Sequence, residues 1–215
     1  MAIIRKVDKK CAICNETYHY QELGEVDTLG MRDLDTRPPG MLRSMQYLLI
    51  QKCPFCGYVN EDISKNAEQI TKEDLAKDTY QKILNDASMN FAIKKYMLRG
   101  ELLKEKNYLR AGMAYLKAAW LADDAKNIQV AKRMRSQAIK YLELSVEYEE
   151  NENIRLIIVD MYRRIGMFEE AKDCAIYVLS NFGLENYKIN ILNYQIELCN
   201  QKDMLDHTIP GNYRF

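Results

Sequence analysis

Four cysteines in two matching pairs are the residues of this sequence best suited to chemistry. Cys11-Ala-Ile-Cys14 and Cys53-Pro-Phe-Cys56 are separated by 38 residues, positions 15 to 52. Each pair can place two thiolates on one short turn, and two such turns supply the four soft ligands that Zn²⁺ binds in a tetrahedron. Because four protein ligands leave no position for water, the pattern predicts one structural zinc ion.

The neighbouring residues fit two metal-binding turns. Asn15 and Gly57 each follow the second cysteine of a pair, and both residue types accept a left-handed backbone. Zinc with four thiolates carries a net negative charge, which basic neighbours would offset. These neighbours are Lys9, Lys10 and Lys52.

A redox dithiol is the alternative for the second pair, because Cys-Pro-Phe-Cys is similar to the motif of glutaredoxins. That chemistry uses a strand-to-helix junction, where the helix N-terminus lowers the thiol pKa. Gly57 follows the pair instead, and a redox dithiol needs no second pair upstream, so zinc is favoured. We expect His19 to lie outside the metal shell, which four cysteines complete.

Strand-like segments border both pairs. Residues 17–21 alternate, with Tyr18 and Tyr20 on one face, and residues 47–51 lead into the second pair. The predicted order is a cysteine turn, a strand, a long connection, a second strand and a second cysteine turn. This order predicts a zinc ribbon.

A long irregular segment, residues 22–45, joins these strands. Its centre holds four charged residues that we single out: Arg32, Asp33, Asp35 and Arg37. The arginines can pair with the aspartates or with an external anion. Two interpretations stay open: a solvated, internally salt-bridged loop, which is favoured, and a loop that contacts a partner or ligand.

After Asn60 the pattern becomes helical. Residues 60–72 are polar and form the predicted linker, and Thr71 is expected to cap a helix. Apolar stripes predict helices at 108–121, 125–148, 154–165, 168–179 and 186–200, with Gly166 ending the third of these. In the tail, Ile209, Tyr213 and Phe215 are candidates to dock onto the helices.

Two helix pairs carry the spacing of tetratricopeptide units, in which small residues such as Ala171 and Ala175 let helices approach. The units are not at the usual spacing of about 34 residues, so we expect an irregular array with a C-terminal capping helix. The predicted fold class is α+β, with a zinc ribbon at residues 1–60 and an all-α tetratricopeptide-like domain at residues 61–215.

The amino-acid composition narrows the classes of function that this protein can have. Lys+Arg and Asp+Glu number 31 each, so no global charge steers the protein to nucleic acid. Apolar runs fall far short of the ~20 residues of a membrane span, and the N-terminus lacks a secretory signal. We therefore expect a cytoplasmic protein, in which paired cysteines bind metal.

The sequence resembles a group of bacterial proteins classed only as a domain of unknown function. That family pairs Cys-x-x-Cys and Cys-Pro-x-Cys-Gly-Tyr with tetratricopeptide-like helices. The resemblance implies this architecture and no activity. The matching residues are Cys11, Cys14, Asp33-Leu-Asp35, residues 53–58, residues 115–120 and residues 163–166.

Three functions remain in competition. The leading one is a non-enzymatic, zinc-stabilised adaptor that binds a protein or peptide partner on its helices. The second is nucleic-acid binding by the ribbon, through phosphate contacts from Lys9, Lys10, Arg32, Arg37, Arg43 and Lys52. The third is an enzyme that uses Asp33, Asp35, Arg37 and His19. No nucleophile, base or open metal site accompanies these carboxylates, so an enzyme is not predicted.

Overall fold

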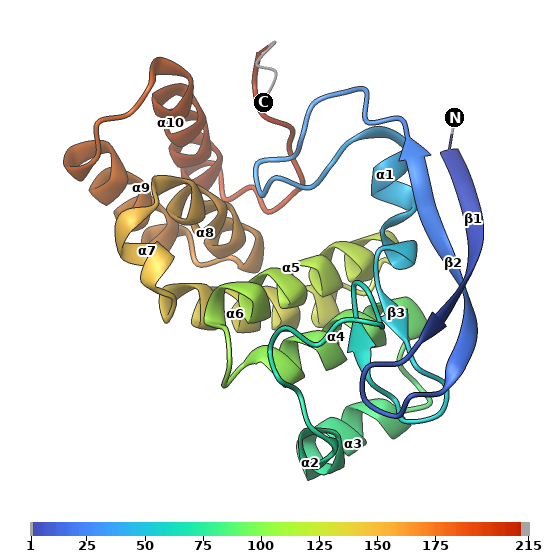
Figure 1. The fold of residues 1–215 in the computed structure, drawn as a ribbon. Helices are drawn as coiled ribbons and strands as arrows, with labels where there is room; N and C mark the ends of the chain where they lie inside the picture. The colour runs from blue at the N-terminus through green and yellow to red at the C-terminus, as the bar shows by residue number, and fades with distance from the viewer. Residues whose placement is uncertain (1, 212–215) are drawn as a thin grey trace.

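A computed structural model describes residues 2–211 of the chain (Figure 1). Tyr213 and Phe215, two candidates for docking, lie outside the described residues. Short antiparallel strands lie near the N-terminus and helices follow, so the α+β class is confirmed. None of the helices within residues 2–211 is long and apolar enough to cross a membrane.

The strands form two small sheets. β1 (Ala2–Lys10) pairs with β2 (Thr17–Val26) in a long twisted hairpin, and β3 (Gln51–Lys52) pairs with β4 (Val59–Asn60). In the hairpin Val7 lies opposite Tyr20, and the side chains of this face turn toward the protein body, where Tyr20 is buried. The sequence patterns did not predict β1, because its apolar and charged residues do not alternate.

Helices make up most of the rest of the described chain. Several begin at an asparagine side chain that accepts backbone N–H groups, as at Asn107, Asn127 and Asn151. The cap at Thr71 and the left-handed Gly166 that ends α8 are both confirmed. The bounds are α1 (Gly40–Ser44), 3-10 turn η1 (Gln46–Leu48), α2 (Lys72–Ala76), α3 (Asp78–Asn85), α4 (Phe91–Leu103), α5 (Tyr108–Asp124), α6 (Ile128–Glu143), α7 (Val146–Glu150), α8 (Glu152–Ile165), α9 (Phe168–Asn181) and α10 (Asn186–Asn200).

One predicted helix is wrong as a single element. Residues 125–148 contain α6 and the beginning of α7, which are separated at Leu144 and Ser145. The Ser145 hydroxyl donates to the carbonyl of Leu142 at 2.6 Å, so the side chain competes for a helical acceptor where α6 ends.

Neighbouring helices pack in sequence order: α4 against α5, α5 against α6, α8 against α9 and α9 against α10. The α5–α6 contact is close, since a Cβ atom at Gly112 would lie 2.5 Å from Cγ of Leu142. Successive antiparallel helices of this kind bury a continuous core while leaving long outer faces.

The ribbon residues and the helices share one hydrophobic core. Its buried members include Tyr20 and Tyr58 from the first sixty residues and Tyr80 and Leu98 from α3 and α4. A second core surrounds α8, α9 and α10, and Leu34 and Ile209 contribute to it.

The predicted linker is packed rather than free. Ile63 is 0% exposed and Ile70 is 2% exposed, and both belong to the first core. The two apolar side chains among polar neighbours anchor residues 60–72 against the helices, so these residues are not a flexible tether.

The segment before the second cysteine pair also differs from prediction. Residues 46–48 form the 3-10 turn η1, and of the predicted strand, residues 47–51, only Gln51 belongs to β3. Side chains of α4 donate hydrogen bonds to the backbone carbonyl groups of this segment, which in a sheet would accept from a neighbouring strand. Tyr96 Oη donates to Gln46 O at 2.9 Å, and Lys95 Nζ donates to Tyr47 O and Ile50 O, both at 2.6 Å.

We predict that Lys95→Met lowers the free energy of unfolding by about 2 kcal/mol or more, because two carbonyl groups lose their donor. Urea denaturation followed by circular dichroism measures this, with exposed Lys82→Met as the control. Burial also lowers the pKa of Lys95 to about 8.

The unfolded chain then binds more protons than the folded chain above pH 8, so Lys95 makes stability rise with pH. Between pH 7 and 9 the parent should gain about 1 kcal/mol relative to Lys95→Met. A difference that does not change with pH would contradict the assignment.

Candidate metal centre and charged loop

The two cysteine pairs form turns of the same design. The first cysteine turn, residues 11–14, joins β1 to β2, and the second cysteine turn, residues 53–56, joins β3 to β4. Asn15 N donates to Cys11 O at 3.0 Å, and Gly57 N donates to Cys53 O at 3.1 Å. Asn15 and Gly57 have φ of 66° and 80°, which confirms the predicted left-handed positions.

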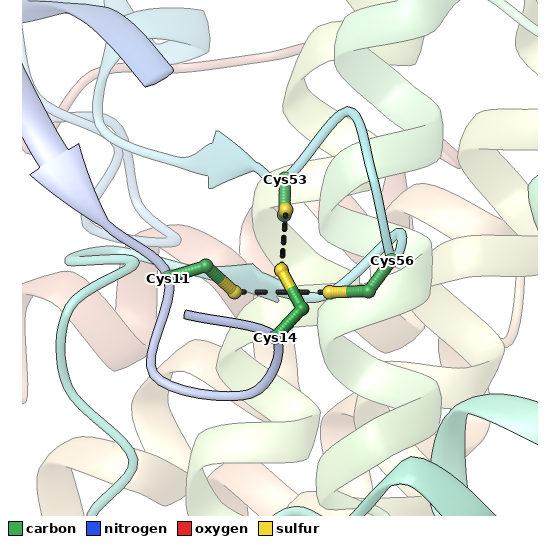
Figure 2. A group of neighbouring side chains, drawn as sticks. All are labelled: Cys11, Cys14, Cys53 and Cys56. Carbon is green, nitrogen blue, oxygen red and sulfur yellow. Dashed lines mark hydrogen bonds between the residues drawn. The ribbon is translucent and has the colours of Figure 1, made fainter. Parts of the chain in front are cut away.

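The turns bring all four sulfur atoms together (Figure 2). Cys11 Sγ lies 3.7 Å from Cys56 Sγ, and Cys14 Sγ lies 3.6 Å from Cys53 Sγ. All four Sγ atoms lie within 4.8 Å of one another. A tetrahedral ion with metal–sulfur bonds of about 2.3 Å places its sulfurs about 3.8 Å apart. The four cysteines, all free of disulfides, could therefore hold one metal ion.

The electrostatics of the cluster favour a bound cation. Cys11 and Cys53 are 1% and 0% exposed. Burial raises the pKa of Cys11 and of Cys56, and the charge of neighbouring cysteines raises both further. Burial acts on Cys53 as well, but hydrogen bonds lower the pKa of its thiol instead. Four thiolates this close together repel one another, and a divalent metal would compensate their charge.

Residues outside the ribbon support both turns. Tyr80 Oη, from α3, donates to Gly57 O at 2.8 Å, and Leu84 packs against the same glycine. Ala12 N donates to Ile63 O at 3.0 Å. Sequence reasoning missed these contacts, because a tyrosine in a distant helix carries no local sign of its partner.

The structural context of a redox dithiol is absent from the second cysteine turn. Cys53 lies between two short strands and not at a helix N-terminus. Its nearest sulfur partner across the cluster belongs to the other pair. His19 extends from the outer face of the hairpin, where its side chain is 80% exposed and contacts Asp8.

The centre of the predicted irregular segment, residues 32–37, is called the charged loop below. Most of its charged side chains are buried, so its interpretation as a solvated loop is wrong. Asp33, Asp35 and Arg37 are 4%, 0% and 1% exposed. Arg37 pairs with Asp124 of α5 at 2.5 Å. Arg32 is the exposed member of the four, and it donates to the carbonyl of Thr36 at 3.2 Å.

Asp35 lies at the centre of a charged network. Its carboxylate accepts from Trp120 Nε1 at 2.6 Å and lies 3.8 Å from Arg135 and 4.0 Å from Arg164. Both arginines also pair with Asp123, at 2.5 and 3.2 Å. The loop thus binds α5, α6 and α8 together.

Asp33 forms a second attachment of the loop. It pairs with Arg43 at 2.5 Å, and Arg43 reaches Asp206 near the C-terminus at 3.1 Å. Burial raises the pKa of Asp33, while Arg43 opposes that shift. The two aspartates therefore bind different partners and do not form a carboxylate pair facing one site.

The fold and the cluster define a mostly helical protein with a four-cysteine site that could hold a metal ion. The chain belongs to the family described as an uncharacterized protein conserved in bacteria (DUF2225), whose match covers residues 4–193. The predicted resemblance is thereby confirmed. Comparisons with curated proteins and with solved structures gave no match.

We predict that Gly57→Ala destabilises the protein by about 1–2 kcal/mol, because alanine must adopt a left-handed backbone there. Thermal unfolding and metal content measure the effect. Gly183→Ala is the matched control, since a Cβ at Gly183 meets no atom within 4 Å. Equal effects of the two substitutions would contradict the strain argument.

We predict that Asp35→Ala destabilises the protein by about 3 kcal/mol or more, because the buried Trp120 Nε1 loses its acceptor and Arg135 loses one of its two carboxylate partners. The exposed Asp173→Ala should stay within about 0.5 kcal/mol of the parent. Urea denaturation measures both. An unfolding free energy unchanged by Asp35→Ala would show that the network does not hold the loop.

Proposed function

We propose that Cys11, Cys14, Cys53 and Cys56 hold one structural Zn²⁺ ion in a protein that acts as a non-catalytic adaptor. The observation that carries the proposal is the closed sulfur cluster, whose spacing suits one tetrahedral ion. Four thiolates fill the shell, so the ion would stabilise the fold without activating water. Thiols stay reduced in the cytoplasm, which is the compartment that we propose.

The helical part, residues 61–215, would supply the surface for a protein or peptide partner. Its helices pack in successive pairs, in keeping with the proposed tetratricopeptide-like arrangement. A hollow of about 370 Å³ lies between them. Methionines adapt well to the shape of a bound segment. The apolar lining comes from Ile83, Met89, Met97, Tyr115 and Met134, with Lys82, Asp86, Arg133 and Gln137 beside them.

The two competing functions lose support from the same contacts. Lys9, Arg37 and Arg43 form ion pairs within the chain, so half of the six predicted phosphate contacts are neutralised. Asp33 and Asp35 are buried against partners, and His19 lies on the hairpin. The residues suggested for catalysis therefore do not share an open site.

Elemental analysis and native mass spectrometry of protein taken from cells test the metal. We expect one zinc per chain, retained in a Cys174→Ser and Cys199→Ser double variant and lost in Cys14→Ser. Loss of the ion should remove much of the fold of the ribbon, because metal binding supplies its folding free energy.

Iron in place of zinc would correct the identity of the ion. A metal-free, fully folded protein would overturn the proposal. Co-purification of a stoichiometric protein on the native chain, weakened by Met89→Glu in the hollow, would support the adaptor role.

A further inference from the structure

The hollow of about 370 Å³ between the helices has an apolar floor and a charged rim. Its buried members include Met97 of α4, Tyr115 of α5 and Met134 of α6. Lys82 of α3 and Arg133 of α6 also line it, and both of these side chains are exposed. An apolar side chain that enters the hollow would therefore lie near two positive charges.

A row of polar side chains on α6 extends this rim. Arg133, Gln137 and Lys140 follow one another at i, i+4 and i+7, so they share one face of the helix. Lys140 Nζ lies 5.4 Å from the ring centroid of Tyr141, and Tyr141 stacks on Tyr115 with centroids 5.6 Å apart. The row thus continues from the hollow for about 10 Å along α6 and has a cation at each end.

The positive charge of this surface is not neutralised from within the protein. Nearby carboxylates are engaged elsewhere: Asp86 accepts from the backbone N and the hydroxyl of Ser88 at 2.9 and 2.6 Å, and Glu101 pairs with Lys104 at 2.7 Å. Even with Asp86 counted, cations outnumber acids around the hollow. We call the basic rim the three exposed cations that form no ion pair within residues 2–211: Lys82, Arg133 and Lys140.

The hollow and the basic rim together favour one class of partner. A hollow lined by methionines is filled by apolar side chains, which a nucleic acid does not offer. The cations in turn attract carboxylates. A small ligand with one carboxylate would meet only one end of the row on α6. An amphipathic helix, in contrast, can present carboxylates at i and i+7, which are also about 10 Å apart.

We propose that the hollow and the basic rim bind an acidic amphipathic helix of a partner protein. Apolar side chains of that helix enter the hollow, and carboxylates seven residues apart meet Arg133 and Lys140, while Lys82 binds a further carboxylate from α3. The inference rests on the proposed adaptor function and deepens it, because it states the charge and the secondary structure of the partner.

Fluorescence anisotropy of the full-length, metal-loaded protein tests the proposal with a labelled peptide of about 18 residues, a length that allows helix formation. The peptide has leucines on one helical face and glutamates on the other. One control peptide has lysine in place of glutamate, and a second has the acidic composition in scrambled order. We expect binding of the acidic amphipathic peptide alone, and weaker binding as salt screens the exposed charges.

Arg133→Glu should weaken binding of the acidic peptide about fivefold or more, because an ion pair is lost and a like-charge repulsion is added. Lys6→Glu is the matched control, since it reverses an exposed cation of β1, which does not line the hollow, and it should leave binding unchanged. The triple variant Lys82→Glu, Arg133→Glu and Lys140→Glu should prefer the lysine peptide. Circular dichroism checks that these exposed substitutions leave the fold intact.

Equal affinity for the lysine peptide, equal affinity for the scrambled peptide, or equal effects of Arg133→Glu and Lys6→Glu would each overturn the inference. Absence of binding to all three peptides would overturn it as well. If a stoichiometric protein still co-purifies and depends on Met89, that result removes this inference alone. If no protein co-purifies either, the proposed adaptor function is removed with it.

Discussion

The N-terminal part of the protein depends on keeping four sulfur atoms, from two buried and two partly buried cysteines, within 4.8 Å of one another. Burial raises the pKa of Cys11 and of Cys56, and four thiolates at this spacing would repel one another strongly, so a bound cation would stabilise the ionised cluster. The two sheets around the cluster contain two strands each and are too small to be stable alone. The stability of this part of the fold therefore has to come from the cysteine cluster and from packing against α3 and α4.

The charged loop contributes to the structure by fixing its own position on the helices, more than by adding net stability. Asp35 and Arg37 are fully desolvated, and the gain from pairing buried charges is offset by the cost of removing them from water. The network fixes where the charged loop lies. The contacts of Asp35 with Trp120 and Arg135 are directional, so they define one placement of the loop on the helices, whereas an apolar contact would allow several. Mispaired alternatives would leave charges buried without partners, and each of these is costly.

Local patterns predicted the features that depend on neighbours in the chain. Cysteine spacing, the backbone at Asn15 and the cap at Thr71 each follow from a few adjacent residues. The burial of Asp35 and the turn at residues 46–48 depend on partners that lie far away in sequence. A charged segment with no apolar alternation indicates a surface loop unless its counter-charges on α5, α6 and α8 are known.

The contact between Tyr80 and Gly57 also bears on the order in which the chain acquires its shape during translation. Gly57, which follows the second cysteine turn, is synthesised 23 residues before Tyr80, and Asp35 precedes Trp120 by 85 residues. The segments α3 and α5 must therefore be synthesised and leave the ribosome before their contacts with the N-terminal segments can form. Until these helices pack, the cysteine thiols of the growing chain stay accessible to oxidants and to competing metal ions.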